Sequence, residues 1–195
     1  MTNMLQSKFF TEKDLKKFGF KSLGKNIKIS SSVKIYGQER ISIGNNVRID
    51  DFTSLTAGDG YIDIGNYVYI GRNCNFVGSL GIEMRDFSVI ASNGCVYSSS
   101  DDYKGNFLTG QAVPKKFRTL VGGKVTIGRH VIIGTTVVIF GKCEIGEGCS
   151  IGALSFVKND LKKWGIYAGS PAVLINNRKK DLLKLEKKLL NEEKQ

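Results

Sequence analysis

Large apolar residues recur every six positions along most of this chain. In the C-terminal half the period runs without a slip through Ile127, Ile133, Ile139, Ile145, Ile151 and Val157. The same register begins at Ile29 and Ile35 and continues in three groups: Ile43, Ile49 and Leu55; Ile64, Ile70 and Phe76; Met84, Ile90 and Val96. From Ile127 to Ile151, a smaller side chain follows each large residue by four positions, and glycine often follows it directly.

A period of six fits neither an α-helix, which repeats near 3.6 residues, nor an ordinary strand, which alternates at two. It describes a short strand, a tight corner and another short strand. Three such units close a triangular coil that turns its large side chains inward. The seventeen units therefore predict an all-β fold, a parallel β-helix of about six coils that spans residues 27–175.

The segment before the repeat, residues 1–26, is predicted to be a helical lead-in. Thr11 and Asp14 have the spacing of a capping box, in which each side chain accepts a hydrogen bond from the backbone of the other. We expect the short helix that follows to turn Leu15 and Phe18 inward.

Two more segments depart from the repeat. Residues 176–195 predict a C-terminal helix, with Leu182, Leu185 and Leu189 on one apolar stripe. Residues 98–124 interrupt the period in mid-repeat. A long excursion from a rigid scaffold is often where function resides. We therefore expect this loop to carry part of the functional site.

Composition narrows the class of protein. A chain of 195 residues suits one domain, and its net charge of +11 favours anionic partners. Nucleic acid is disfavoured because the charge is dispersed and no recognition motif is present. No apolar run approaches the roughly 18 residues of a membrane span, and the first residues lack an apolar targeting segment. These features predict a cytoplasmic protein that binds phosphorylated small molecules.

The four cysteines form no CxxC pair. In a cytoplasmic chain, Cys74, Cys95, Cys143 and Cys149 are expected to be reduced and to pack as small core residues. The chain also has a single histidine. Because catalytic zinc needs several nitrogen or sulfur ligands, no metal site is expected.

Several stretches resemble one family of enzymes. Residues 127–175 look like the end of a hexapeptide-repeat acetyltransferase, a left-handed parallel β-helix. Within that group, residues 42–52, 81–87 and 97–105 resemble the N-acyltransferases that modify dTDP-4-amino-4,6-dideoxyglucose for O-antigens and related surface glycans. The likeness covers roughly residues 12–185.

The resemblance implies a homotrimer with active sites in the grooves between neighbouring prisms. It also implies two ligands, an acyl-CoA along the prism and a nucleotide-linked amino sugar that enters from the loop side. Each ligand carries a diphosphate, which suits the basic chain.

The same resemblance suggests catalytic residues. Asp101 occupies the position at which the O-acetylating branch keeps a histidine base, and Asp102 is its neighbour. Adjacent carboxylates are also common in turns and caps. His130 is a further candidate, although a solvent-facing position at a coil corner is the simpler interpretation. A carboxylate is a weak base for a hydroxyl but a suitable acceptor for the proton of a sugar ammonium, which favours N- over O-acylation.

Binding residues follow in the same way. Backbone N–H groups at the coil edges are candidate donors to the coenzyme or to a developing oxyanion, near Gly134, Thr135, Gly152 and Ala153. The side chains that could meet its phosphates are Lys158, Arg178 and Lys179. The candidates on the sugar-nucleotide side are Tyr103, Asn106, Lys116 and Arg118.

Two other functions remain open from the sequence. One is an O-acetyltransferase of a sugar or polysaccharide. The other is a non-catalytic β-helical scaffold, against which the interrupting loop argues.

Overall fold

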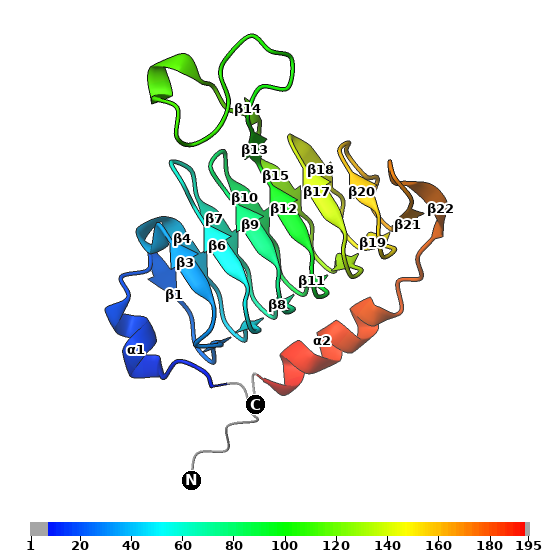
Figure 1. The fold of residues 1–195 in the computed structure, drawn as a ribbon. Coiled ribbons are helices and arrows are strands. Elements are labelled where there is room, and N and C mark those ends of the chain that lie inside the picture. Colours follow the sequence, from blue (N-terminus) through cyan, green and yellow to red (C-terminus); the bar gives the residue numbers. More distant parts are fainter. Residues whose placement is uncertain (1–7, 194–195) are drawn as a thin grey trace.

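The computed structural model describes residues 8–193, and most of them form a parallel β-helix with three faces (Figure 1). Face 1 stacks β1 (Ser22–Leu23), β4 (Ile41–Ile43), β7 (Ile62–Ile64), β10 (Ile82–Met84), β15 (Val125–Ile127) and β18 (Cys143–Ile145). Face 2 stacks β2 (Lys28–Ile29), β5 (Arg48–Ile49), β8 (Tyr69–Ile70), β11 (Val89–Ile90), β16 (Ile132–Ile133), β19 (Ser150–Ile151) and β21 (Gly165–Ala168), and β22 (Val173–Asn177) pairs antiparallel with β21. Face 3 stacks β3 (Lys34–Tyr36), β6 (Ser54–Thr56), β9 (Asn75–Val77), β12 (Cys95–Tyr97), β17 (Val138–Phe140) and β20 (Phe156–Val157).

The six-residue period sets the register between coils. On face 1, Ile64 pairs with Met84 and Met84 with Ile127, so that large side chains lie directly above one another in the core. These positions are buried, which confirms the predicted fold class. The number of coils was underestimated. β21 adds a strand to face 2 beyond the last predicted unit. β1 adds one to face 1, although it lies within the segment 1–26 that was predicted to be a helical lead-in.

The corners explain why glycine follows so many of the large residues. At Gly134, an added Cβ would lie 2.6 Å from the backbone nitrogen of Ala153 in the next coil. The coils therefore approach too closely for a side chain at that position. Two residues further on, the backbone passes through the left-handed region, as at Asn46, Phe87 and His130 with φ near 57°, 58° and 59°. Asparagine tolerates this conformation well, whereas bulky residues adopt it at a cost.

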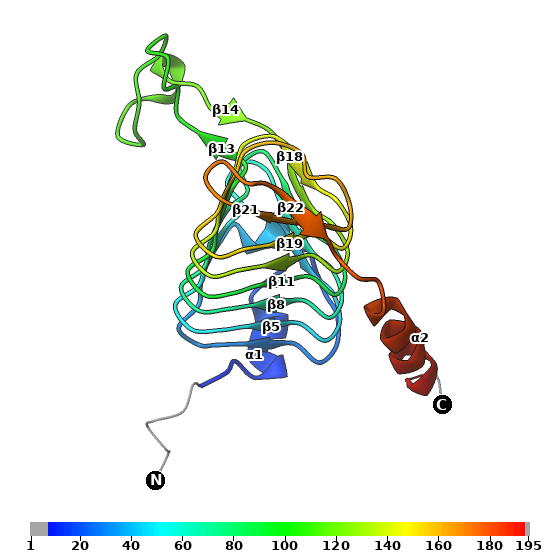
Figure 2. The ribbon, with the colours of Figure 1, turned by 90° about the vertical axis from the view of Figure 1, so that its right-hand side faces the viewer.

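Both ends of the β-helix carry a helix. The capping box of α1 (Glu12–Lys17) is present as predicted, and Leu15 is buried. Phe18 ends the helix and is not part of the buried core: it is 36% exposed and packs edge-on against Phe10. The predicted C-terminal helix is α2 (Leu182–Glu192). It runs outside the prism, along the corner between faces 1 and 2 (Figure 2).

The excursion leaves the prism between β12 and β15 and stands away from it (Figures 1 and 2). At its base β13 (Ser99–Ser100) pairs antiparallel with β14 (Val121–Gly122). Two short 3₁₀ helices complete the chain, η1 (Gln38–Arg40) at the corner before β4 and η2 (Lys115–Phe117) within the excursion.

Three of the four cysteines are core residues, as expected. Cys74, Cys143 and Cys149 are buried and all four thiols are free. Burial raises the pKa of Cys74 to about 11 and that of Cys143 to about 12, so both are neutral thiols near pH 7. The prediction for Cys95 is wrong, because its side chain is half-buried on the outer surface of face 3.

Candidate active site

The excursion and face 3 together form a pocket of about 630 Å³. Its floor is mainly apolar and comes from four strands: Val77, Tyr97, Val138, Phe140 and Phe156. Its polar groups come chiefly from the base of the excursion: Ser99, Ser100, Asp101, Tyr103 and Gln111. An apolar floor with a few convergent polar groups is typical of a site for a small molecule.

Asp101 is the acidic residue that lines this pocket. Its Oδ2 accepts a hydrogen bond of 2.9 Å from the N–H of Gly110, which fixes the orientation of the carboxylate. Its Oδ1 has no hydrogen bond within residues 8–193. The carboxylate is therefore oriented by the loop and still has an oxygen to accept a proton or hydrogen bond from a ligand.

Asp102 has a different role, although it is adjacent in sequence. Its buried carboxylate accepts backbone N–H groups from Lys104 at 2.8 Å, Asn106 at 2.7 Å and Phe107 at 3.2 Å. These hydrogen bonds hold the pKa of Asp102 below its usual value. Asp102 thus organises the turn after the pocket, as the interpretation of a turn or cap anticipated.

His130 lies on another corner of the prism, between faces 1 and 2. The prediction that it faces solvent is wrong, since it is only 7% exposed. Its ring stacks on Phe87 with centroids 5.1 Å apart, and its Nε2 lies 2.8 Å from Oε2 of Glu186 in α2. Burial, and after it the charge of Arg129, lowers the pKa of His130. Within one chain, the structure does not bring His130 together with Asp101.

Sequence reasoning missed these partners of His130 because Phe87 is one coil away and Glu186 is more than fifty residues away. Local patterns, such as the Thr11 and Asp14 spacing that predicted the capping box of α1, give no signal for such distant contacts. Only the position of Glu186 inside the apolar stripe of the predicted helix marked it as unusual.

The predicted coenzyme-binding residues fall into two groups. The N–H of Gly134 donates to the carbonyl of Ile151, and that of Gly152 to Tyr167, both at 2.8 Å. These two amides are therefore used within the β-helix and are not free donors for a coenzyme. Thr135 and Ala153 are exposed beside them, at the corner between faces 2 and 3.

The three predicted phosphate ligands also differ. Arg178 is engaged within the fold: its Nη1 donates to the carbonyl of His130 at 2.7 Å and also contacts the carbonyls of Gly148 and Cys149. It ties the chain after β22 to the corner between faces 1 and 2. Lys158 and Lys179 are exposed.

On the loop, the four predicted sugar-nucleotide residues lie in different settings. Tyr103 is almost fully exposed and lines the pocket. Lys116 lies 4.8 Å from the ring centroid of Phe117, and Nε of Arg118 donates to the carbonyl of Val113 at 3.0 Å. Asn106 is exposed, and its N–H is one of the donors to Asp102.

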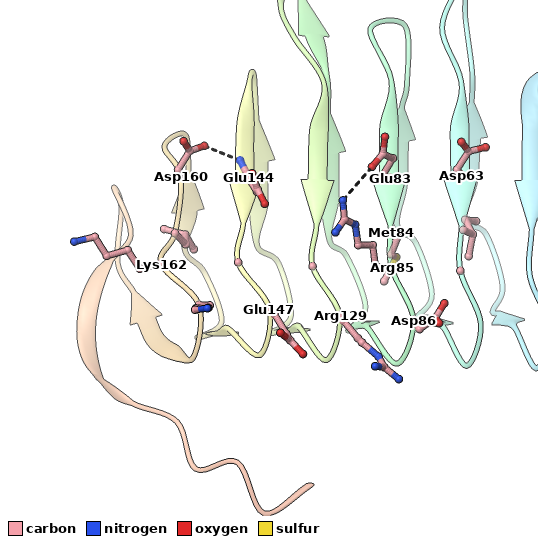
Figure 3. Close-up of a pocket in the computed structure, with 16 residues that line it drawn as sticks. Asp63, Glu83, Met84, Arg85, Asp86, Arg129, Glu144, Glu147, Asp160 and Lys162 are labelled. Atoms are coloured by element: carbon pink, nitrogen blue, oxygen red, sulfur yellow. Dashed lines mark hydrogen bonds and ion pairs between the residues drawn. The ribbon is translucent and has the colours of Figure 1, made fainter. Parts of the chain in front are cut away.

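A second, larger groove of about 1070 Å³ lies over face 1 (Figure 3). Sequence reasoning missed it, although the signal was there: the middle residue of a three-residue strand points outward, and it is acidic in β7, β10 and β18. Asp63, Glu83 and Glu144 form this row, with Asp160 beside Glu144. Arg85, Arg129, Lys162 and Lys163 also line the groove, so its charge is mixed. The pocket on face 3 is the better candidate because it combines an apolar floor with the polar groups of the excursion.

The described residues also bear on other classes of site. Across residues 8–193, no group of three or more His, Cys, Asp or Glu side chains could hold a metal ion. In the same part of the chain, neither helix is long and apolar enough to cross a membrane.

The three-faced parallel β-helix of this chain is the fold of hexapeptide-repeat acetyltransferases. The hexapeptide-repeat acetyltransferase VCA0836 of Vibrio cholerae shares this fold, with a TM-score of 0.57, 22% identity and coverage of 85% of this chain and 78% of its own. No protein-family profile matches the sequence. A more similar relative is the dTDP-4-amino-4,6-dideoxy-D-glucose acyltransferase of Escherichia coli, 42% identical over 178 residues, which are 91% of this chain and 93% of the relative. The chain belongs to that family of acyltransferases.

Solved structures agree with this assignment. AntD, an N-acyltransferase from Bacillus cereus crystallised with dTDP and 3-hydroxybutyryl-CoA, has a TM-score of 0.92 and 42% identity, and the match covers 97% of this chain and all of AntD. A variant of AntD in which a serine is replaced by alanine, crystallised with dTDP-4-amino-4,6-dideoxyglucose and coenzyme A, has a TM-score of 0.91 and 44% identity. The match covers 96% of this chain and all of that variant.

Proposed function

We propose that this chain transfers the acyl group of an acyl-CoA to the amino group of a dTDP-linked 4-amino-4,6-dideoxy sugar, for use in surface glycans such as O-antigens. The observation that carries the proposal is the combination of 42% identity over nearly the whole chain with a pocket that presents one oriented carboxylate. AntD, which is equally similar, is known with both kinds of ligand bound.

The reaction needs no covalent enzyme intermediate. In a ternary complex the sugar nitrogen attacks the thioester carbonyl, the C–N bond forms, and the C–S bond breaks as coenzyme A thiolate leaves. Asp101 accepts the proton that the nitrogen loses and orients the amine through its free Oδ1. Asp102 keeps the loop in the conformation that aims Asp101 into the pocket.

Substrate contacts are assigned around this point. Tyr103 and Asn106 follow Asp101 closely in the chain and are assigned to the sugar. Lys116 and Arg118 supply positive charge for the diphosphate of the nucleotide. The coenzyme lies along the corner between faces 2 and 3, against Thr135 and Ala153, with Lys158 and Lys179 for its phosphates.

We also propose that the enzyme is a homotrimer, because the apolar floor of the pocket is only half-buried within one chain. A neighbouring prism would close it and exclude water from the reacting atoms. Sedimentation equilibrium at micromolar concentration should give three times 21.5 kDa, and a monomer or a dimer would contradict the proposal. The free thiols favour a cytoplasmic location, where disulfides are rare.

The test is a substrate screen that follows the release of free thiol. The donors are acetyl-CoA and 3-hydroxybutyryl-CoA, and the acceptors are dTDP-, UDP- and GDP-linked amino sugars. The matched control is the dTDP-6-deoxy sugar with a hydroxyl in place of the 4-amino group. We expect turnover with the dTDP-linked amine and none with the hydroxyl compound.

Turnover of the hydroxyl compound would instead identify an O-acyltransferase. No turnover with any acceptor, together with no binding of coenzyme A, would favour the scaffold.

A further inference from the structure

The outer surface of face 3 changes in character from one end of the prism to the other. One outward position recurs in register in successive coils and is held, in chain order, by Ser54, Asn75, Cys95, Val138 and Phe156. The first three are small or polar and lie outside the pocket, whereas Val138 and Phe156 line it. The pocket thus lies over the part of face 3 whose outward side chains are apolar.

A third apolar side chain completes this part of the surface. Phe140 is the other outward residue of β17 and pairs in register with Tyr97. Val138, Phe140 and Phe156 all line the pocket, and each is half-buried within one chain. We call these three residues the apolar wall. None of their side chains has a hydrogen-bonding group, so the wall suits a hydrocarbon part of a ligand.

The apolar wall lies between the places assigned to the two substrates. Each coil passes through faces 1, 2 and 3 in that order, so a strand of face 3 begins at the corner with face 2 and ends at the corner where the excursion leaves. The coenzyme is assigned to the first corner, beside Thr135 and Ala153. The sugar amine is assigned to the other side, beside Asp101. The thioester therefore has to reach across the wall to meet the amine.

The geometry of a thioester decides which group lies against the wall. Its carbonyl carbon bears the sulfur, which leads back to the coenzyme, a small oxygen and the acyl chain. The nucleotide is directed elsewhere, because Lys116 and Arg118 belong to the excursion, which stands away from the prism (Figures 1 and 2). The acyl chain is thus the hydrocarbon group available to cover the wall.

We infer that the apolar wall is the subsite for the acyl chain, and that the enzyme transfers butyryl, an unbranched four-carbon group, in preference to acetyl. This inference rests on the proposed function. Val138 and Phe156 are register neighbours in adjacent coils, about 4.8 Å apart. An acetyl methyl can contact one of them, whereas a four-carbon chain can contact both. Burial of each added methylene favours binding about fourfold, so two should give about fifteenfold.

The test compares acetyl-, propionyl- and butyryl-CoA as donors to dTDP-4-amino-4,6-dideoxyglucose, with the full-length protein and thiol release as the measurement. kcat/KM should rise in that order, by about tenfold or more from acetyl to butyryl. The informative quantity in each variant is the ratio of kcat/KM for butyryl-CoA to that for acetyl-CoA, because partial misfolding lowers both values equally.

Two variants change the wall and one serves as a control. Val138→Phe fills the space for the chain, so the ratio should fall to about one. Phe156→Ala removes one of the two contacts, so the ratio should fall several-fold. The matched control is Ser54→Phe, which adds the same ring at the same outward position but outside the pocket. Its ratio should equal that of the unchanged enzyme.

Equal kcat/KM for acetyl-CoA and butyryl-CoA in the unchanged enzyme would overturn the inference. An unchanged ratio in Val138→Phe would also overturn it. If that variant instead showed a several-fold higher KM for the nucleotide sugar, the wall would belong to the sugar or the base.

Calorimetry of the donors without acceptor separates this inference from the proposed activity. Butyryl-CoA should bind about tenfold more tightly than acetyl-CoA, and Val138→Phe should abolish the difference. This result would support the subsite even if the amino sugar were not acylated. Equal binding of the two donors would overturn the subsite whatever the acceptor.

Discussion

Faces 1 and 3 of the prism share one backbone design and differ in what they present to a ligand. Both are hollowed, and the groove on face 1 is the larger, at about 1070 Å³ against 630 Å³. Face 1 carries a row of carboxylates, whereas face 3 carries an apolar floor and one oriented aspartate. Volume and outward side chains thus favour different faces, and the proposed site follows the side chains.

The difference has an electrostatic consequence. Strands in neighbouring coils lie about 4.8 Å apart, so the acidic residues of β7 and β10 form a closely spaced row. Part of this charge is neutralised within the face: Lys124 is 2.9 Å from Glu83 and is the main cause of the lowered pKa of that carboxyl. Glu144 and Asp160 have no ion pair within residues 8–193. Arg85, Arg129, Lys162 and Lys163 line the same groove, so face 1 offers a diphosphate a mixture of charges. The loop over face 3 instead carries an excess of basic residues.

The largest expected effect is that of Asp101→Asn. Asparagine keeps the shape and an acceptor oxygen but cannot take up a proton, so the turnover number should fall at least tenfold and toward the 10²–10⁴-fold range of general bases. The deficit should shrink as pH rises, because the free amine then predominates. The measurement is the pH profile of turnover by thiol release. Near-normal turnover at all pH values would remove Asp101 from the mechanism.

The second effect is that of Asp102→Asn. The amide cannot replace the carboxylate as the acceptor of three backbone N–H groups, so the excursion should loosen and the KM for the nucleotide sugar should rise several-fold, with a smaller loss of turnover than in Asp101→Asn. Hydrogen exchange of peptides from residues 98–124 should show the loosening. Unchanged exchange would contradict the organising role of Asp102.

The lowered pKa of Asp102 determines how the stability of the excursion depends on pH. The folded state binds the proton less readily than the unfolded chain. The stabilisation is therefore present above the usual carboxyl range near pH 4 and is lost as pH falls through the lowered value. Exchange in the excursion of the unchanged protein should rise only in acid, whereas the variant should show fast exchange already at neutral pH.

Features of the fold that depend on residues close in sequence could be predicted, whereas those that depend on residues distant in sequence could not. The fold was predictable because each hexad carries its own signal: Ile127, Ile133 and Ile139 are fully buried, as their spacing requires. The capping box of α1 was equally local. The number of coils was not, because β21 buries Tyr167 where the repeat would have placed an aliphatic residue.

The site was harder to predict than the fold for the same reason. The base of the excursion could be located because the repeat stops there. The difference between Asp101 and Asp102 could not, since it depends on how the next nine residues fold back to donate their N–H groups. The burial of His130 and the use of Arg178 depend on contacts across more than forty residues.

The third effect concerns the outer surface of face 3. Cys95 is half-buried beside the hydroxyl of the pocket-lining Tyr97, whereas the other three thiols are buried. Iodoacetamide should therefore modify one thiol of the native protein, and mass spectrometry should locate it at Cys95. The added group should reduce activity a few-fold by narrowing the pocket. Cys95→Ser, as control, should stay active and resist the reagent, and rapid modification of Cys143 would contradict the assignment.

The smallest expected effect is that of Glu144→Gln on face 1. The change removes one negative charge from the acidic row and leaves the length and hydrogen-bonding capacity of the side chain. Glu144 is exposed and its carboxylate has no partner within residues 8–193, so no buried group is left unpaired and stability should change by less than about 0.5 kcal/mol. If the two faces are as different as proposed, kcat/KM for both substrates should stay within about twofold of the unchanged enzyme. A modest gain in affinity for the anionic substrates would fit the loss of long-range repulsion and should disappear at high salt. A tenfold loss of kcat/KM would mean that the acidic row contacts the substrates of a neighbouring subunit, and the division between a catalytic face 3 and a non-catalytic face 1 would then be wrong.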